Sequence, residues 1–216
     1  MSRQSGAVIE LIISRIDSGE FLPGFSIDEK AMMEVCGVSR TPVREALIRL
    51  ETIGLVQRHP RKGAVIFRPT VTEFLEILEL HANLESYAAG LAAKRITDAL
   101  KLELSNVVSL CEAHSLQHEN NEPAQYYQLN LQFHETVVRA AQNDVLLEMV
   151  KTNARKLMAY YRLRYRLPDT VKKSAIDHAK IANHIIAHRS SDAEAAMLEH
   201  FNYDRQTVMD LIASVN

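Results

Sequence analysis

The spacing of apolar residues over the first 70 positions predicts short helices followed by a β-hairpin. Glycines and a Pro-Gly pair separate the helical segments, and a polar tip containing Pro60 and Gly63 separates the two strand-like runs. Three helices followed by a hairpin predict a winged helix-turn-helix domain over residues 1–70. The expected elements are helices at residues 7–16 and 29–35 and between 39 and 54, and strands at 55–57 and 64–67.

Helical spacing continues beyond Thr70, and no strand-like alternation persists there. Pro123 and Pro168 fall at breaks between the predicted helices. We therefore predict a mainly α protein whose second part, residues 71–216, is an all-helical bundle. Its expected helices lie near residues 71–95, 97–119, 123–141, 143–161, 170–188 and 191–213.

The composition of the 216 residues is that of an ordinary globular protein, with 47% hydrophobic and 24% charged residues. No apolar run approaches the roughly 18 residues that a membrane span needs, and the first residues do not have the pattern of a signal peptide. Cys36 and Cys111 are the only cysteines, too few for a disulfide framework. These features lead us to expect a cytoplasmic protein that does not enter a membrane.

The charge distribution points to nucleic acid at the N-terminal end. The whole chain has a net charge of −2, whereas residues 1–70 carry 10 Lys and Arg against 8 Asp and Glu. Gly37 permits a tight turn, and Arg40 and Arg44 stand at the start of the helix that follows it. An arginine in that position can bond O6 and N7 of guanine in the major groove. The hairpin tip is basic as well, so the domain is predicted to bind double-stranded DNA.

Histidine is concentrated in the second part, where eight of the nine histidines lie beyond residue 80. Asn130 and His134 are four residues apart and share a helix face. His178 and His200 fall on the last two predicted helices, which can bring their rings to one level. Such a set can hold a divalent transition metal. The pairs His184/His188 and His114/His118 have the same i, i+4 spacing and leave rival sites open on spacing alone.

The N-terminal motifs resemble those of the GntR family of bacterial regulators. They are PG at 23–24, GVSRTPVREAL at 37–47, RLETIGLV at 49–56 and RKGAVI at 61–66. By this resemblance Arg40 and Arg44 read bases, and the remaining contacts touch the backbone or a groove. The DNA-binding residues that it implies are Lys30, Ser39, Arg40, Thr41, Arg44, Arg61, Lys62 and Gly63.

The second part resembles the FCD domain of the FadR subfamily, a bundle of six or seven helices that binds a small ligand. LELHANLESYAAGLAA at 78–93 and NLQFHETVVRAAQNDVLLEM at 130–149 carry the resemblance. Many members hold a metal with an aspartate and three histidines, and a carboxylate effector completes the metal's coordination. The resemblance implies zinc or nickel as the metal, and Asn130, His134, His178 and His200 as its ligands.

Two positions depart from that pattern. Asn130 stands where the family has aspartate, and an amide oxygen is a weaker, neutral ligand. His81 stands where the family commonly has an arginine associated with the carboxylate site. His81 is therefore a candidate effector contact, and Arg162 and Arg164, together with Arg166, are candidate substitutes for binding an acid.

These inferences predict a homodimeric regulator that binds a palindromic operator and releases it when a small carboxylate binds. We expect the regulator to repress transcription, because most relatives are repressors. A metal-free regulator that senses an acyl-thioester or another bulky ligand stays open. An enzyme with a catalytic metal is disfavoured, since the chain has neither HExxH nor GxSxG and carries a DNA-binding head.

Overall fold

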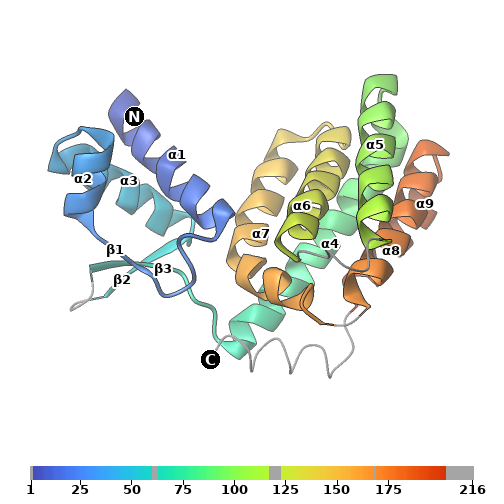
Figure 1. The fold of residues 1–216 in the computed structure, drawn as a ribbon. Helices are drawn as coiled ribbons and strands as arrows, with labels where there is room; N and C mark the ends of the chain where they lie inside the picture. Colours follow the sequence, from blue (N-terminus) through green and yellow to red (C-terminus); the bar gives the residue numbers. More distant parts are fainter. Residues whose placement is uncertain (1, 60–62, 117–122, 168, 203–216) are drawn as a thin grey trace. The chain divides into compact units, whose positions relative to one another are not determined.

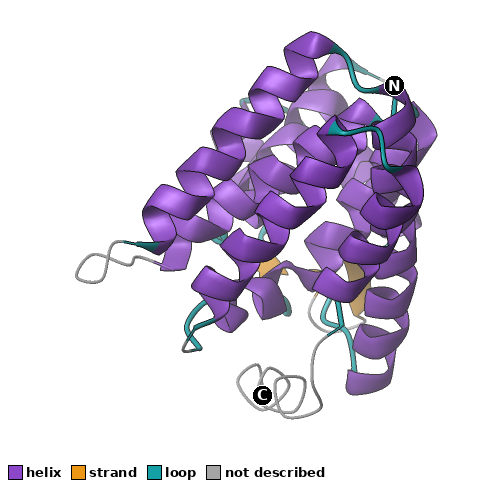
Figure 2. Cartoon of the chain, turned by 90° about the vertical axis from the view of Figure 1, so that its right-hand side faces the viewer, coloured by secondary structure: helices purple, strands orange, loops and turns teal. Residues whose placement is uncertain are grey.

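The computed structural model describes residues 2–59, 63–116, 123–167 and 169–202, and it divides into two compact units, Met1–Glu73 and Phe74–Asn216. The first unit contains three helices and a small sheet, and the second consists of helices (Figure 1). Figure 2 shows how little of the chain is strand. No helix in the described ranges has both the length and the apolar character needed to cross a membrane.

The first unit is built on the pair of helices α1 and α3. Helix α1 begins after Ser2, which accepts a hydrogen bond from the Ser5 amide, and ends at Gly19 with φ of 80°. The buried apolar residues of α1, Val8, Ile12 and Ile16, recur every four positions, and α1 packs against α3. The helices of this unit are α1 (Arg3–Ser18), α2 (Glu29–Cys36) and α3 (Arg40–Thr52).

The predicted hairpin is present, and a short third strand extends it. The strands are β1 (Ser26–Ile27), β2 (Val56–His59) and β3 (Gly63–Ile66), in the order β1-β3-β2 with antiparallel pairing. Ser26 and Ile27 form the short strand β1, which the sequence did not predict. Asp28 caps α2, because its side chain accepts hydrogen bonds from the amides of Lys30 and Ala31. The extra strand pairs with the edge of β3 that β2 leaves open, so it fixes the base of the wing.

The second unit is a bundle of six helices among the described residues, which agrees with the number predicted. Alanines of α4 allow close helix packing: Ala88 lies in a core cluster with Val138 of α6 and with Leu146 and Val150 of α7. The helices are α4 (Val71–Arg95), α5 (Asp98–Ser115), α6 (Pro123–Ala140), α7 (Asp144–Arg164), α8 (Thr170–Ile186) and α9 (Ser190–His200). Helix α9 ends at His200, short of the end of the predicted helix 191–213. Residues 203–213 of that prediction, and residues 117–119 of the predicted helix 97–119, lie outside the described residues.

Helix α9 is fixed to α4 by hydrogen bonds from side chains to backbone oxygens. Ser86 donates to Glu194 O at 2.8 Å, and Ser190 donates to Gly90 O at 3.0 Å. His188 Nδ1 lies 2.7 Å from Ala93 O. These contacts set the position of His200 at the end of α9.

Candidate functional site

The turn between α2 and α3 presents the start of α3 to solvent. Gly37 ends α2 with φ of 63°, a left-handed conformation that favours glycine. Val43 and Leu47 of α3 are fully buried, whereas Arg40 and Arg44 on the opposite face are exposed. The helix therefore has a core face and a basic outer face, as a major-groove reading helix requires.

The other predicted DNA contacts lie on the same small unit. Lys30, Ser39, Thr41 and Gly63 are exposed. Within the described residues the Ser39 side chain makes no capping hydrogen bond, so the first amides of α3 are available to a phosphate. Gly63 has φ of 70° at the start of β3. The predicted wing residues Arg61 and Lys62 fall outside the described residues.

Arg44 makes one contact that DNA binding would have to replace. Its Nε lies 3.7 Å from Glu29 Oε2 of α2, and both side chains are partly exposed. An exposed ion pair of this kind contributes little to stability. Arg44 can therefore exchange Glu29 for a base or a phosphate at small cost.

Three histidines from α6, α8 and α9 come together inside the second unit. One nitrogen from each of His134, His178 and His200 lies within 4.8 Å of the other two. Among the described residues, this is the only group of three or more potential metal-ligating side chains that lie so close together. The ring of His178 is fully buried and stacks on Phe133, with 3.8 Å between ring centroids.

Burial keeps two histidines of the cluster, His178 and His200, in the form that a metal needs. Loss of solvent lowers the pKa of His178 and of His200 well below the ordinary value. The neighbouring histidines and the positive charge of Arg164 lower both pKa values further. Neutral imidazole is the form that binds metal ions, so His178 and His200 are prepared for a cation at neutral pH.

Two carboxylates lie beside histidines of the cluster, and one of them, Asp177, is hydrogen-bonded to its histidine. Asp177 Oδ2 lies 3.1 Å from His200 Nδ1, and Glu85 Oε2 of α4 lies 3.2 Å from His134 Nδ1. A carboxylate at Nδ1 favours the tautomer whose Nε2 carries the free lone pair. Histidine ligands of metals in proteins commonly have such partners. Asp177 and Glu85 are residues of the candidate site that the sequence interpretation did not single out.

Asn130 lines a cavity together with His134 and His200, and its amide oxygen already accepts a hydrogen bond. The Tyr165 hydroxyl donates a hydrogen bond of 2.7 Å to Asn130 Oδ1. The Tyr165 hydroxyl also lies 3.4 Å from Ser174 Oγ, which lies 3.4 Å from His178 Nε2. The amide oxygen keeps one lone pair for a metal, because a carbonyl oxygen has two.

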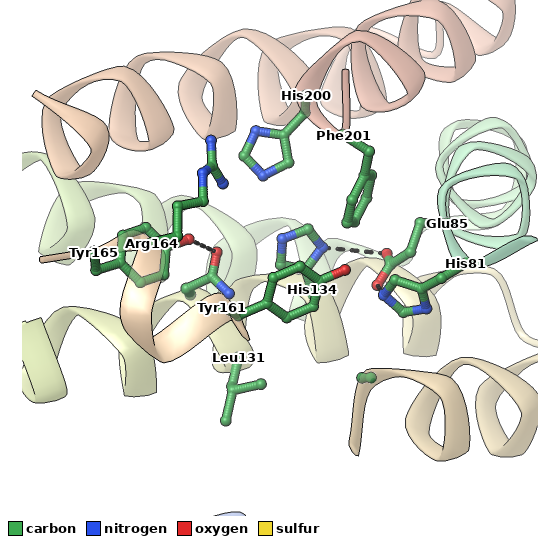
Figure 3. A pocket seen from close by; sticks show the side chains of 11 residues that line it. His81, Glu85, Leu131, His134, Tyr161, Arg164, Tyr165, His200 and Phe201 are labelled. Carbon is green, nitrogen blue, oxygen red and sulfur yellow. Dashed lines mark hydrogen bonds and ion pairs between the residues drawn. The ribbon is translucent and has the colours of Figure 1, made fainter. Parts of the chain in front are cut away.

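His134 and His200 of the cluster line a small cavity, in which the centre of a water-sized molecule can occupy about 20 Å3. Figure 3 shows Arg164 and Glu85 on opposite sides of His134. Two of the predicted effector contacts, His81 and Arg164, line this cavity and are almost fully buried. Arg162 is not among the residues that line it. Its guanidinium lies 4.7 Å from the centre of the Tyr127 ring, because two residues along α7 turn a side chain through about 200°.

The rival histidine pairs occupy other environments. His184 Nδ1 accepts a hydrogen bond from Arg189, and His188 contacts the backbone of α4. His114 lies beside Tyr126, and its partner His118 falls outside the described residues. The described contacts of these histidines are helix-end and packing contacts.

Comparison with known proteins agrees with both units. Residues 4–66 match the model of bacterial regulatory proteins of the gntR family, and residues 76–203 match the FCD domain. The chain belongs to the GntR family. This regulator is 30% identical to the HTH-type transcriptional regulator YdhC of Bacillus subtilis over 88% of its own length and 84% of that protein. The relatives are named as transcriptional regulators, which confirms that the chain is a regulator and not an enzyme.

Two further matches extend the comparison. The gluconate operon transcriptional repressor of Bacillus subtilis is 29% identical to this GntR-family regulator over 69% of the chain and 59% of the repressor. The structure of Escherichia coli McbR/YncC superposes with a TM-score of 0.80 over the full length of both chains, at 19% identity. That similarity confirms the mainly helical fold with its winged helix-turn-helix. The FCD match makes the second unit a ligand-binding domain of a DNA-binding regulator.

Proposed function

We propose that this GntR-family regulator is a metal-assisted repressor that leaves its operator when a small carboxylate binds. The observation that carries the proposal is the cluster of His134, His178 and His200, whose nitrogens lie within 4.8 Å of one another. Nitrogen atoms that lie close together in a low dielectric are costly unless they bind a hydrogen-bond donor or a cation. A cation between them satisfies all three.

The donor set fits zinc or nickel. Imidazole nitrogen suits both ions, and the Asn130 oxygen offers a fourth, neutral ligand. His178 Nδ1 is buried and has no hydrogen-bond partner among the described residues, which supports a metal ligand role for this ring. When bound, the metal would supply positive charge and open coordination positions beside the cavity. Asp177 and Glu85 would hold the His200 and His134 rings in place.

The charge of the site favours an anion as effector. None of the four ligands is anionic, so the carboxylates of Asp177 and Glu85, beside His200 and His134, are the described negative charges that would oppose the two positive charges of the ion. Arg164 adds a further positive charge beside the cavity and is only 3% exposed. A carboxylate bound here would reduce this excess and occupy a coordination position. This argument supports the carboxylate class without naming a compound.

A homodimer on a palindromic operator follows from the size of the DNA-reading surface. One helix-turn-helix offers few base contacts, so two copies on two half-sites are needed for specificity. The sign of regulation rests on the family and on the name of the gluconate operon repressor. Effector binding in the bundle and DNA binding at α3 would be coupled reciprocally.

The test measures operator binding by fluorescence anisotropy, with the protein loaded with zinc or treated with chelator. We expect one or more small carboxylates to weaken DNA binding about tenfold or more when zinc is present, and to have no effect after chelation. A His134→Ala/His178→Ala variant should bind DNA but lose the response, whereas His184→Ala on α8 should keep it.

Metal content provides the second readout. Protein purified without a polyhistidine tag should carry one metal ion per chain in the wild type and none in the double variant, as measured by elemental analysis. Equal, negligible metal in both proteins would refute the metal site. Release of DNA by an acyl-thioester with and without chelator would favour the metal-free alternative.

A further inference from the structure

The DNA-reading helix α3 carries one apolar side chain on its outer face. All residues of α3 are described, and its buried residues are Pro42, Val43, Ala46, Leu47 and Leu50. The one other apolar residue of the helix, Ile48, is 54% exposed. Single exposed apolar residues are common on protein surfaces, so the meaning of this one depends on where it lies on the helix.

Ile48 lies at the centre of the face that points away from the core. The buried residues of α3 span an arc of about 140°, since successive residues of an α-helix are turned through about 100°. Ile48 is turned about 170° from the middle of that arc, and Thr41 and Arg44 lie within about 40° of Ile48. Ile48 therefore shares its face with two of the residues that are proposed to contact DNA.

The charged side chains on either side of Ile48 contact other elements of the same unit. Arg44 Nε lies 3.7 Å from Glu29 Oε2 of α2. The hydroxyl of Ser2, which precedes α1, donates a hydrogen bond of 3.5 Å to Glu45 Oε2. These contacts hold Arg44 toward α2 and Glu45 toward α1, so the outermost surface between them is the aliphatic side chain of Ile48.

The major groove offers a matching apolar group in the C5-methyl of thymine, which cytosine lacks. Ile48 follows Arg44 by one turn, or about 6 Å along the helix axis, which equals about two base-pair steps of about 3.4 Å. A side chain on the groove-facing surface at that distance can reach a base pair beside the one that Arg44 contacts. Contact between Ile48 and a thymine methyl would remove apolar surface of both groups from water.

We propose that Ile48 determines part of the operator sequence by packing against the C5-methyl of a thymine, about two base pairs from the guanine that Arg44 contacts. The inference rests on the proposed base contacts of Arg40 and Arg44. It adds a thymine that hydrogen bonds from the arginines do not select. Cytosine at the same position would leave the Ile48 side chain without an apolar partner.

The test uses full-length protein and a labelled duplex that carries the sequence the protein selects from a library of random DNA duplexes. Each thymine is replaced in turn by deoxyuridine in both half-sites, which removes the methyl and preserves base pairing. Fluorescence anisotropy should show that one replacement weakens binding about ten- to twentyfold, because each methyl contact contributes about fourfold per half-site. Replacement of guanines by 7-deazaguanine, which lacks the N7 acceptor, locates the guanine that Arg44 contacts, because Arg44→Ala should be insensitive to that replacement.

Ile48→Ala should bind the thymine and deoxyuridine duplexes with affinities that differ by less than about twofold, because alanine does not reach the methyl. Alanine has a higher helix propensity than isoleucine, so α3 should persist in this variant. Val35→Ala removes an aliphatic side chain of similar exposure, 59%, from α2 and should keep the wild-type difference between the two duplexes. If Ile48→Ala does not fold, the replacements with the wild-type protein decide the question.

Three results would overturn the inference, and they differ in what else they contradict. If no deoxyuridine replacement weakens wild-type binding while Arg44→Ala does, the thymine contact is wrong and base reading by Arg44 stands. If the sensitive thymine is equally sensitive in Ile48→Ala, another side chain makes the contact. If Arg44→Ala binds the duplex as tightly as the wild type, the proposed base reading by α3 is contradicted, and the inference fails with it.

Discussion

Asn130→Asp tests the role of the cavity in metal binding, because it changes one neutral oxygen into a carboxylate at the histidine cluster. The substitution preserves the shape of the side chain, and the Tyr165 hydroxyl, which donates to Asn130 Oδ1 at 2.7 Å, can donate equally to an aspartate. Asn130 is 5% exposed. The substitution therefore adds one buried charge and removes no hydrogen bond.

We expect Asn130→Asp to lower the stability of the metal-free protein and to raise its affinity for zinc. Without metal, the buried carboxylate should cost about 2 kcal/mol of stability, which lowers the Tm by about 4–8 °C. With zinc, attraction between unit charges 4 Å apart is worth about 4 kcal/mol at an effective dielectric of about 20, and desolvation of the carboxylate offsets part of it. We expect a net gain in zinc affinity of about 10- to 100-fold.

The assay combines thermal melting of chelated and zinc-loaded protein with a competition titration against a fluorescent zinc chelator. Asn106→Asp, on the exposed face of α5, introduces the same charge away from the cavity and should change neither quantity. An Asn130→Asp protein with unchanged or weaker zinc affinity would refute the reasoning that places the metal beside Asn130.

Three further predictions follow from the described contacts. Arg44→Ala should weaken operator binding by about 1–3 kcal/mol in anisotropy titrations, and loss of less than about twofold would contradict a base-reading role. Asp177→Asn should lower zinc affinity about 10- to 100-fold, because His200 Nδ1 loses the carboxylate 3.1 Å away; an unchanged affinity would show that Asp177 does not orient the ring. Gly37→Ala should destabilise the first unit by about 1–2 kcal/mol in urea unfolding, since φ is 63° and a Cβ there would have no described atom within 4 Å. A neutral effect would mean that the turn relaxes.

The elements of the DNA-reading unit were predictable because local rules determine them. Gly37 can adopt the left-handed conformation that ends α2, and apolar spacing distinguishes Val43 and Leu47 from the exposed arginines. The short strand β1 was missed because two residues carry no periodicity. Its existence depends on pairing with β3, which is a contact between distant parts of the chain.

The histidine cluster was predictable in part. Spacing placed His134 on one helix and His178 and His200 on two others, but it could not choose among the rival pairs. The packing of α6, α8 and α9 brings His134, His178 and His200 together. Arg162 and Arg164 looked equivalent in sequence. Because α7 continues to residue 164, the two side chains point in different directions, and only Arg164 lines the cavity.

Glu85 and Asp177 carried weak signals that reasoning about ligands alone overlooked. Glu85 follows His81 by four residues on one helix face, and Asp177 is adjacent to His178. Their partners, His134 and His200, lie on other helices, so tertiary packing was needed to connect them.

The central claim is that this regulator binds a specific operator through the start of α3 and senses a ligand in its helical bundle. The most direct test is selection of bound fragments from a library of the genome that encodes it, using the intact protein and the Arg40→Ala/Arg44→Ala variant. The account predicts enrichment of a palindromic sequence by the wild type and none by the variant. Failure of the wild type to enrich any sequence, or equal enrichment by the variant, would contradict it.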